Sequence, residues 1–397
     1  MATYKEQNKL NVPHLRFPEF HGEWEKCKLG DIAILTKGSG ISKDQRSATG
    51  TPCILYGELY TTYKSEVIDY VVSKTDISDK NLVRSCANDI IIPSSGETAI
   101  DISTARCVLS PDVLLGGDLN IIRLKDGDGR FFSYQLNGVR KHDIAKIAQG
   151  VSVVHLYGES IKGLTVSFPS NKEQQKISTL LSLIDERIAT QNKLIEDLKK
   201  LKSAIIEIEY TPNTKTTSPI GDVIEQISKR NKNNAIQNVL SVSNRQGFIK
   251  QSDQFENRNV ASEDTSNYKI VEQNDFAFNP ARINVGSIAR LTTFEKGIVS
   301  PMYVCFRTQE NVAPEYIDYF FESKHFYCEI QKRLEGSVRQ CLSFEGLCNI
   351  PLSLPSFEIQ QRIGKRIFTL EQKIKMETDL LELLNKQKQY LLRQMFI

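Results

Sequence analysis

Two stretches of the chain, "FPSNKEQQKI" at 168–177 and "LPSFEIQQRI" at 354–363, decide the fold. Each reads as an apolar residue, Pro-Ser, three variable residues, Gln-Gln, a basic residue and Ile, and the second begins 186 residues after the first. At this offset, 156–206 lies over 342–392 without a gap. The sequence therefore predicts two similar half-molecules within one chain.

The similarity continues upstream of these helix entrances. "NDIIIP" (88–93) lies over "NDFAFN" (274–279) at the same offset, and "LGDIAILTKG" (29–38) resembles "IGDVIEQISK" (220–229) at an offset of 191. A chain of 397 residues is also too long for one ordinary core. We expect each half to consist of a variable globular part followed by a similar helical part.

The segments after the Gln-Gln pairs carry a heptad seam, because apolar residues recur at alternating steps of four and three. The same two steps are polar in both copies: Gln191 and Glu377, then Lys202 and Lys388. The pattern predicts two long helices that pair antiparallel, like a coiled coil, about a pseudo-twofold axis; packing against another element or a partner protein is the alternative. The seam positions are Ile177, Leu181, Ile184, Ile188, Gln191, Ile195, Leu198, Ile363, Ile367, Leu370, Ile374, Glu377, Leu381 and Leu384.

Both helix starts have capping residues. Ser170 with Glu173 matches a capping box, and Ser356 repeats the cap with Glu358 in the first turn. The first helix is expected to end before Pro212. A helix of about 36 residues is roughly 54 Å long.

The globular parts mix short strands with helices, so the fold class is α+β. The runs 69–73, 89–94, 119–125 and 302–308 are typical of strands, and 314–334 is typical of a helix.

Motif searches exclude several classes of function. The eight cysteines contain no C-x-x-C and the five histidines no H-E-x-x-H, so we expect reduced thiols in the cytoplasm and no metal site. No apolar window approaches the length of a membrane span. "FNPAR" (278–282) has Ala281 and Arg282 where the Asn-Pro-Pro-aromatic motif of amino-methyltransferases has proline and an aromatic ring. We predict no catalytic site.

The net charge of +3 does not itself indicate a nucleic-acid partner, so candidate DNA contacts are local. Two basic loops, "TKGSGISKDQR" (36–46) and "SKRNKNN" (228–234), stand at corresponding points of the two copies, and Arg, Lys, Asn and Gln are the side chains that contact phosphates and base edges. The ordinary alternative for such loops is a solvated surface. The candidates are Lys37, Ser39, Lys43, Gln45, Arg46, Lys229, Arg230, Asn231 and Lys232, with Arg106, Asn244, Arg245 and Arg282 as further positions.

The loops before the two helices, 149–160 and 335–346, share Gly150/Gly336, Leu156/Leu342 and Glu159/Glu345. They are either structural turns or contact loops, and the sequence leaves both alternatives open.

At this point the chain resembles a known family, the specificity subunits of type I restriction–modification systems. The opening "VPHLRFPEFHGEWEKCKLGDIA" (12–33) and the two Pro-Ser-x-x-x-Gln-Gln entrances, in this order and duplicated, carry the resemblance over nearly the whole chain. The resemblance implies target recognition domains at 1–165 and 211–351. It also implies conserved helices at 166–210 and 352–397 that act as a spacer and partner dock.

The resemblance further implies a chain without catalysis that reads a bipartite, asymmetric sequence in double-stranded DNA. Two modification subunits, which bind S-adenosylmethionine and methylate adenine at N6, and restriction subunits, which use ATP and magnesium, are the implied partners. The chain itself is expected to bind no cofactor and no membrane. Two rivals remain: a coiled-coil scaffold without DNA readout, and a self-contained methyltransferase or nuclease.

Overall fold

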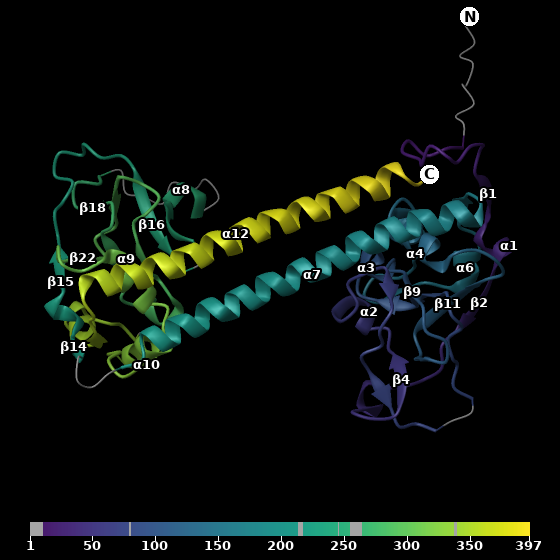
Figure 1. Ribbon diagram of the computed structural model, residues 1–397, viewed down its shortest axis with the longest axis horizontal. Coiled ribbons are helices and arrows are strands. Elements are labelled where there is room, and N and C mark those ends of the chain that lie inside the picture. Colours follow the sequence, from purple (N-terminus) through teal and green to yellow (C-terminus); the bar gives the residue numbers. More distant parts are fainter. Residues whose placement is uncertain (1–10, 79–80, 213–216, 245, 255–263, 337–339) are drawn as a thin grey trace, which may run out of the picture. The chain divides into compact units, whose positions relative to one another are not determined.

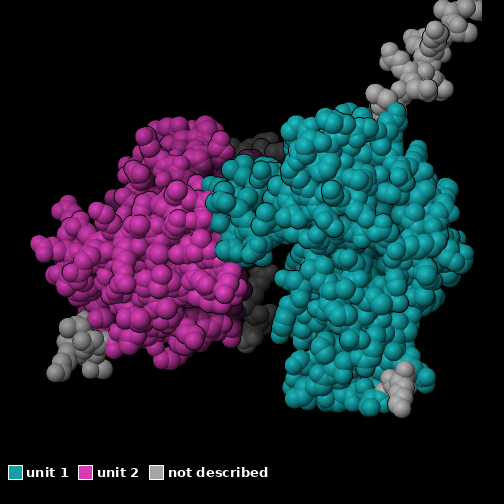
Figure 2. Space-filling view, turned by 45° about the vertical axis from the view of Figure 1, so that its right-hand side comes forward, with its two compact units in different colours: residues 1–192, 379–397 teal, residues 193–378 magenta. Residues whose placement is uncertain are grey.

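The computed structural model describes residues 11–78, 81–212, 217–244, 246–254, 264–336 and 340–397. The chain forms two compact units, one of residues 1–192 with 379–397 (unit 1) and one of residues 193–378 (unit 2) (Figure 2). Both long helices contribute residues to both units. The four-part domain division remains a prediction, since these units follow contacts and cut through both helices.

Two helices, α7 (Asn171–Glu209) and α12 (Phe357–Gln394), are far longer than the other described helices (Figure 1). α7 begins just after Pro169-Ser170 and ends before Pro212, as the sequence predicted. Its 39 residues correspond to a length of about 58 Å. The observed helices are thus slightly longer than the sequence estimate.

Unit 1 contains a five-stranded and a four-stranded sheet with short flanking helices. The five-stranded sheet has the order β2 (Ala33–Lys37), β11 (Leu119–Leu124), β7 (Asp89–Pro93), β9 (Arg106–Val108), β5 (Val67–Ile68). The other sheet has the order β10 (Leu114–Leu115), β4 (Thr51–Ile54), β6 (Lys74–Thr75), β3 (Arg46–Ser47), and two-stranded ladders join β1 (Glu25–Lys28) to β13 (Thr165–Phe168) and β8 (Ser95–Gly96) to β12 (Val154–His155). The helices are α1 (Leu29–Ile32), η1 (Lys43–Gln45), α2 (Glu58–Thr61), α3 (Ala99–Ile102), α4 (Gly129–Asn137), α5 (Lys141–Ile147) and α6 (Gly158–Lys162).

Unit 2 repeats this architecture with two four-stranded sheets. One has the order β15 (Ile224–Ile227), β22 (Val304–Thr308), β19 (Phe276–Phe278), β20 (Ile288–Arg290), and the other the order β17 (Gly247–Lys250), β16 (Val239–Ser243), β21 (Lys296–Val299), β18 (Lys269–Glu272). A ladder joins β14 (Thr217–Pro219) to β23 (Pro351–Ser353). The helices are η2 (Ile220–Asp222), α8 (Gln251–Gln254), η3 (Ile283–Val285), α9 (Pro314–Phe320), α10 (Lys324–Gln331) and α11 (Phe344–Cys348).

The internal repeat is visible in the backbone. Asn88 and Asn274, at equivalent positions, both have positive φ, which asparagine tolerates better than most residues. The next residue, Asp89 or Asp275, accepts a main-chain N–H three residues back and pairs with an arginine, Arg123 or Arg307. The predicted alignment of 88–93 with 274–279 is therefore confirmed as one turn-and-strand structure used twice.

Two secondary-structure predictions are wrong. Residues 69–73 form no strand, because Tyr70 and Val72 are exposed and the neighbouring pairing uses β5 and β6 instead. The helix expected at 314–334 breaks into α9 and α10 at Ser323, whose hydroxyl accepts the N–H of Phe326 and starts a new helix.

The first glutamine of each Gln-Gln pair joins its long helix to a globular domain. Gln174 is buried, donates from Nε2 to Pro169 O (2.8 Å) and accepts the Asp128 N–H on Oε1 (3.0 Å). Gln360 repeats both contacts, with Pro355 O (2.9 Å) and the Ala313 N–H (2.9 Å). The second glutamine of each pair is exposed.

Glu173 has a role other than the predicted capping box. Its buried carboxylate accepts two hydrogen bonds from Arg16, both of 2.8 Å, in the bidentate geometry that arginine favours. The acid thus joins the N-terminal segment to the start of α7.

Each unit packs the start of one long helix with the end of the other. In unit 1, Ile177 and Leu181 of α7 share a core with Leu391 of α12; in unit 2, Ile363 of α12 shares a core with Ile205 of α7. Every predicted seam position is buried or half-buried. Burial therefore follows the heptad pattern.

An aromatic residue just after each long helix packs into the core of a unit. Phe396, just after α12, packs at a ring-centroid distance of 5.0 Å from Phe131 and 6.5 Å from Trp24 in unit 1. Tyr210, its counterpart at the offset of 186, packs 4.8 Å from Tyr316 in unit 2 and donates its hydroxyl to Tyr316 O (2.6 Å).

The two lysines that interrupt the seam form ion clusters, of which the one in unit 1 is buried and the one in unit 2 is partly exposed. In unit 1, Lys388 Nζ lies 2.5 Å from both Glu66 Oε2 and Asp185 Oδ1, and the Tyr134 hydroxyl donates to Asp185 (2.8 Å). Burial lowers the pKa of Lys388, but the charges of Glu66 and Asp185 outweigh it, so the pKa is raised.

Unit 2 has the equivalent cluster. Lys202 Nζ lies 2.7 Å from Glu322 Oε2 and 2.6 Å from Glu371 Oε1, and the Tyr319 hydroxyl donates to Glu371 (2.8 Å). The polar seam residues thus pair across α7 and α12 within each unit, and each cluster also includes side chains of the globular domain.

Candidate nucleic-acid interface

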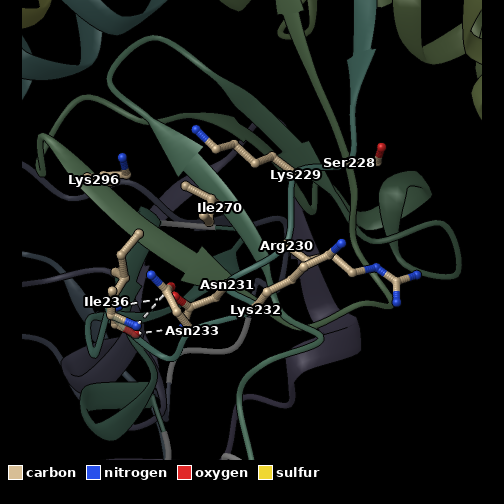
Figure 3. A pocket seen from close by; sticks show the side chains of 10 residues that line it. Ser228, Lys229, Arg230, Asn231, Lys232, Asn233, Ile236, Ile270 and Lys296 are labelled. Atoms are coloured by element: carbon tan, nitrogen blue, oxygen red, sulfur yellow. Dashed lines mark hydrogen bonds between the residues drawn. The ribbon is translucent and has the colours of Figure 1, made fainter.

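The basic loop of unit 2 lines an open cleft of about 960 Å³, referred to below as cleft 2. The loop follows β15 and is held by main-chain hydrogen bonds from Ile270 N to Lys229 O (2.8 Å) and from Asn231 N to Tyr268 O (3.0 Å). Lys229, Arg230 and Lys232 are exposed on it. Lys296 of β21 completes the lining, and Figure 3 shows these cationic side chains around the cleft.

The charges of cleft 2 act on one neighbouring acid. Hydrogen bonding and the charge of Lys296, assisted by Lys229, lower the pKa of Glu272, which lies 2.8 Å from Lys296. Glu272 is outside the lining, which contains four cations and no carboxylate: Ser228, Lys229, Arg230, Asn231, Lys232, Asn233, Ala235, Ile236, Ile270 and Lys296. This chemistry suits a polyanion.

The basic loop of unit 1 lines a second cleft of about 820 Å³, referred to below as cleft 1. Lys43 and Gln45 come from η1 and Arg46 from β3, and all three are exposed. The Gln45 side chain accepts the Ser42 N–H (2.8 Å) in a capping box that fixes the turn. Opposite this loop stand Tyr56, Glu58 and Asp118.

The two basic loops occupy equivalent places in the fold. One follows β2, which pairs antiparallel with β11; the other follows β15, which pairs antiparallel with β22. β11 and β22 in turn pair antiparallel with β7 and β19. The correspondence between the loops that the sequence indicated is therefore present in the sheet topology.

Two predicted DNA contacts are buried and have structural roles. The Arg106 guanidinium donates to the main-chain oxygens of Tyr63 (3.1 and 3.2 Å) and Ala105 (3.0 Å), and burial lowers its pKa. Asn231 is fully buried; its amide donates to Ile236 O (2.9 Å) and accepts from Ile236 N (3.1 Å), as the dashed lines in Figure 3 show. Asn231 thus shapes the loop on which its cationic neighbours stand.

The remaining predicted residues are distributed over several places. Lys37 is exposed at the end of β2, and the Ser39 hydroxyl accepts the Val83 N–H (2.7 Å), which anchors the glycine-rich turn. Asn244 and Arg282 are exposed outside cleft 2, and Gly286, in the turn after Arg282, approaches Asn244. Arg245 lies outside the described residues.

Sequence reasoning missed Lys296, which is distant in sequence from the loop that it faces, and it missed Tyr56 and Glu58, which follow their loop but carry no local signal of the contact. A strand alignment that placed β21 beside β18 would have brought Lys296 to the loop. For the loops 149–160 and 335–346 the sequence left two alternatives open. Gln149 forms a bridge with His155 and Glu335 with Cys341, and the residue after Gln149 or Glu335 is a glycine with positive φ, Gly150 or Gly336. This supports the structural-turn alternative, although the first turn also exposes Val151 almost completely.

Over the described part of the chain, no helix has the length and hydropathy needed to cross a bilayer. Nor do three or more His, Cys, Asp or Glu side chains gather there in an arrangement for a metal ion.

Two known specificity subunits of type I restriction enzymes resemble the chain over nearly its whole length. It is 23% identical to the type I restriction enzyme MjaVIII specificity subunit of Methanocaldococcus jannaschii, over 98% of this chain and 95% of that protein. It is also 23% identical to the putative MjaX specificity subunit of the same organism, over 98% of this chain and 94% of that protein.

Solved structures share the fold. The type I restriction–modification S subunit of M. genitalium matches with a TM-score of 0.61 at 18% identity, over 97% of this chain and 99% of that one. A chain from a study of complex assembly and conformational transition of the type I system matches with a TM-score of 0.53 at 13% identity, over 93% and 96%.

The family model for the type I restriction modification DNA specificity domain matches twice, at 21–200 and 212–386. The two matches cover the two repeats found in the sequence and in the strand order. The members of this family are the non-catalytic specificity components of their systems, in agreement with the absence of a catalytic motif. The chain belongs to the family of type I restriction–modification DNA specificity subunits.

Proposed function

We propose that this chain selects the DNA sequence for a type I restriction–modification complex by reading a bipartite, asymmetric target with its two globular domains. The observation that carries the proposal is the pair of clefts at equivalent places in two repeats, each lined by a basic loop but by otherwise different side chains. Surfaces that contact different parts of a DNA target must differ in side chains, whereas their scaffolds need not.

The long helices would act as a spacer between the half-sites and as the dock for two adenine-N6 methyltransferase subunits, with restriction subunits joining the assembly. S-adenosylmethionine, ATP and magnesium would be bound by those partners in the cytoplasm. The repeated helix starts and ends support this part, since they offer two copies of one frame to two copies of a partner.

Mapping methylated adenines in cells with and without the gene tests the proposal. We expect methylation of one two-part sequence to disappear with the gene and to return with the full chain, provided that the modification subunit is present. Unchanged methylation would support the scaffold alternative. Adenine methylation by the purified chain alone would support the self-contained enzyme.

The spacer role has its own test. Inserting seven residues into both α7 and α12 keeps the heptad phase and lengthens each helix by about 10 Å. We expect the unspecified spacer of the methylated sequence to lengthen while both half-sites keep their bases. An unchanged spacer in an active complex would contradict a ruler function for the helices.

A further inference from the structure

The two clefts differ in charge. Cleft 2 is lined by four cations and no carboxylate, whereas cleft 1 has two cations, Lys43 and Arg46, and two carboxylates, Glu58 and Asp118. Lys296 pairs with Glu272, while Lys229, Arg230 and Lys232 are exposed on the loop. Exposed cations attract a DNA phosphate, and carboxylates beside the phosphate repel it. The clefts are thus suited to different parts of the DNA, although they lie at equivalent places in the repeat.

Cleft 2 presents several charges on a fixed loop. The buried Asn231 amide holds the loop through Ile236, while its neighbours Arg230 and Lys232 are exposed. Lysine side chains are flexible point charges, well suited to phosphates and poorly suited to planar base edges. The loop backbone is therefore ordered. Its two lysines, Lys229 and Lys232, suit phosphates, and Arg230 Nη1 donates to Asn267 Oδ1 (3.0 Å).

Cleft 1 instead presents a guanidinium beside a buried carboxylate. Arg46 Nε donates to Lys43 O (3.3 Å), and its Nη1 lies 3.7 Å from Glu58 Oε1. Glu58 is buried, and its carboxylate is fixed by the Leu55 N–H (2.8 Å) and by the Ser73 hydroxyl. The Arg46 side chain is still 39% exposed toward the cleft. A buried carboxylate is costly to keep in a protein, and here it directs a partly exposed arginine.

We propose, on the basis of the function above, that the clefts divide the work: cleft 2 holds the phosphate backbone, and cleft 1 reads a base edge with Arg46, which Glu58 positions. Arginine most commonly reads guanine, through O6 and N7 in the major groove. The half-site read by unit 1 accordingly contains a guanine that depends on Arg46.

The test uses the complex of the full chain with its modification subunits. Affinity for target and non-target duplexes is measured from low to moderate salt, and the methylated sequence is mapped for each variant. The plot of log K against log salt has a negative slope, and "slope" below means its magnitude. Each lost phosphate contact reduces this magnitude by about 0.9. The variants are K229Q/R230Q/K232Q in cleft 2 and R46Q, R46K and E58Q in cleft 1, with K250Q as the control for an exposed cation outside both clefts.

We expect the triple variant to lower the slope by about two to three and to weaken binding to all duplexes equally, with the methylated sequence unchanged. We expect R46Q to leave the slope nearly unchanged but to relax one guanine position in one half-site. E58Q should relax the same position to a smaller extent, since it releases Arg46 without removing it. R46K should resemble R46Q, because lysine lacks the planar fork.

Two results would overturn the division of work. The first is a cleft 2 triple variant that changes a half-site at constant slope, and the second is an R46Q complex whose slope falls by about one with its sequence unchanged. Failure of the underlying function looks different: the unmodified complex would then bind target and non-target duplexes equally.

Discussion

The ammonium group of Lys388 lies 2.5 Å from the carboxylate of Asp185, and the same contact recurs between Lys202 and Glu371 at 2.6 Å. In each case the lysine stands near the end of one long helix and the acid near the start of the other. The acids, Asp185 and Glu371, are 186 positions apart, and so are the lysines, Lys202 and Lys388. A polar seam position thus fixes the register of a helix end within its unit.

Replacing Lys388 by methionine should destabilise unit 1 by about 3–5 kcal/mol, because Glu66 and Asp185 would remain buried without their cation. Urea unfolding followed by Trp24 fluorescence measures this, since Trp24 is the single tryptophan and lies in the core of unit 1. K386A is the control: Lys386 forms an exposed pair with Glu382, worth at most about 0.5 kcal/mol. Equal effects of the two substitutions would contradict the role of the cluster.

The Lys388 cluster should also give unit 1 an alkaline stability limit. The pKa of Lys388 is raised in the folded chain. The stabilisation of unit 1 by the cluster is therefore fully present below the ordinary lysine pKa of about 10.4, and it is lost as pH rises through the pKa of Lys388 in the folded chain. The difference in urea midpoint between the unmodified chain and K388M is expected to stay constant from pH 7 to 10 and to shrink above it. A difference that is independent of pH up to 12 would argue against charge as its origin.

The two glutamines of "EQQK" offer an internally matched test. Q174A leaves the Asp128 N–H and the Pro169 carbonyl without their partner, at a cost of about 1–3 kcal/mol. Q175A removes an exposed side chain and should change stability by less than about 0.5 kcal/mol. Trp24 fluorescence in urea distinguishes them, and the same asymmetry is expected for Q360A and Q361A in unit 2 by hydrogen exchange.

Phe396 should stabilise unit 1 although the globular part of that unit precedes it by more than 200 residues. F396A removes a buried ring that contacts Phe131 and Trp24, at a cost of about 3–5 kcal/mol. Y390A, at an exposed position of the same helix, is the control. If F396A left the Trp24 unfolding transition unchanged, the helix end would not be part of that core.

Arg106 should affect stability and not DNA sequence choice. Lysine cannot reproduce the guanidinium hydrogen bonds to Tyr63 O and Ala105 O, so R106K is expected to lose about 1.5–3 kcal/mol. The methylated sequence should remain that of the unmodified chain. A changed sequence at unchanged stability would return Arg106 to the set of DNA contacts.

The parts of the fold that the sequence predicted are those whose signal is local and repeated. The heptad spacing predicted buried positions from Ile177 to Leu384, and burial follows it. The run at 69–73 misled because β-branched and aromatic residues favour strands intrinsically, whereas Tyr70 and Val72 find no neighbouring strand to pair with. Burial of Arg106 was equally invisible, since it also donates to the main-chain oxygens of Tyr63 and Leu59, more than forty residues away.

The basic loops were found because their cations are contiguous in the sequence. Lys296 and Glu58 were not found, because strand pairing and a short helix bring them to the clefts. Glu58 also appears in sequence as an ordinary surface acid; its contacts with Leu55 N and Ser73 show that the carboxylate is fixed, 3.7 Å from Arg46 Nη1.

The glutamine contacts at the two helix starts have a consequence for how such a chain can change. Among the described residues, the side chains of Gln174 and Gln360 hydrogen-bond to main-chain groups, those of Asp128 and Pro169 in one unit and of Ala313 and Pro355 in the other. Every residue type except proline offers the same N–H, and every residue offers the same carbonyl. A globular domain can therefore change the side chains at this contact while the glutamine joint needs no compensating mutation.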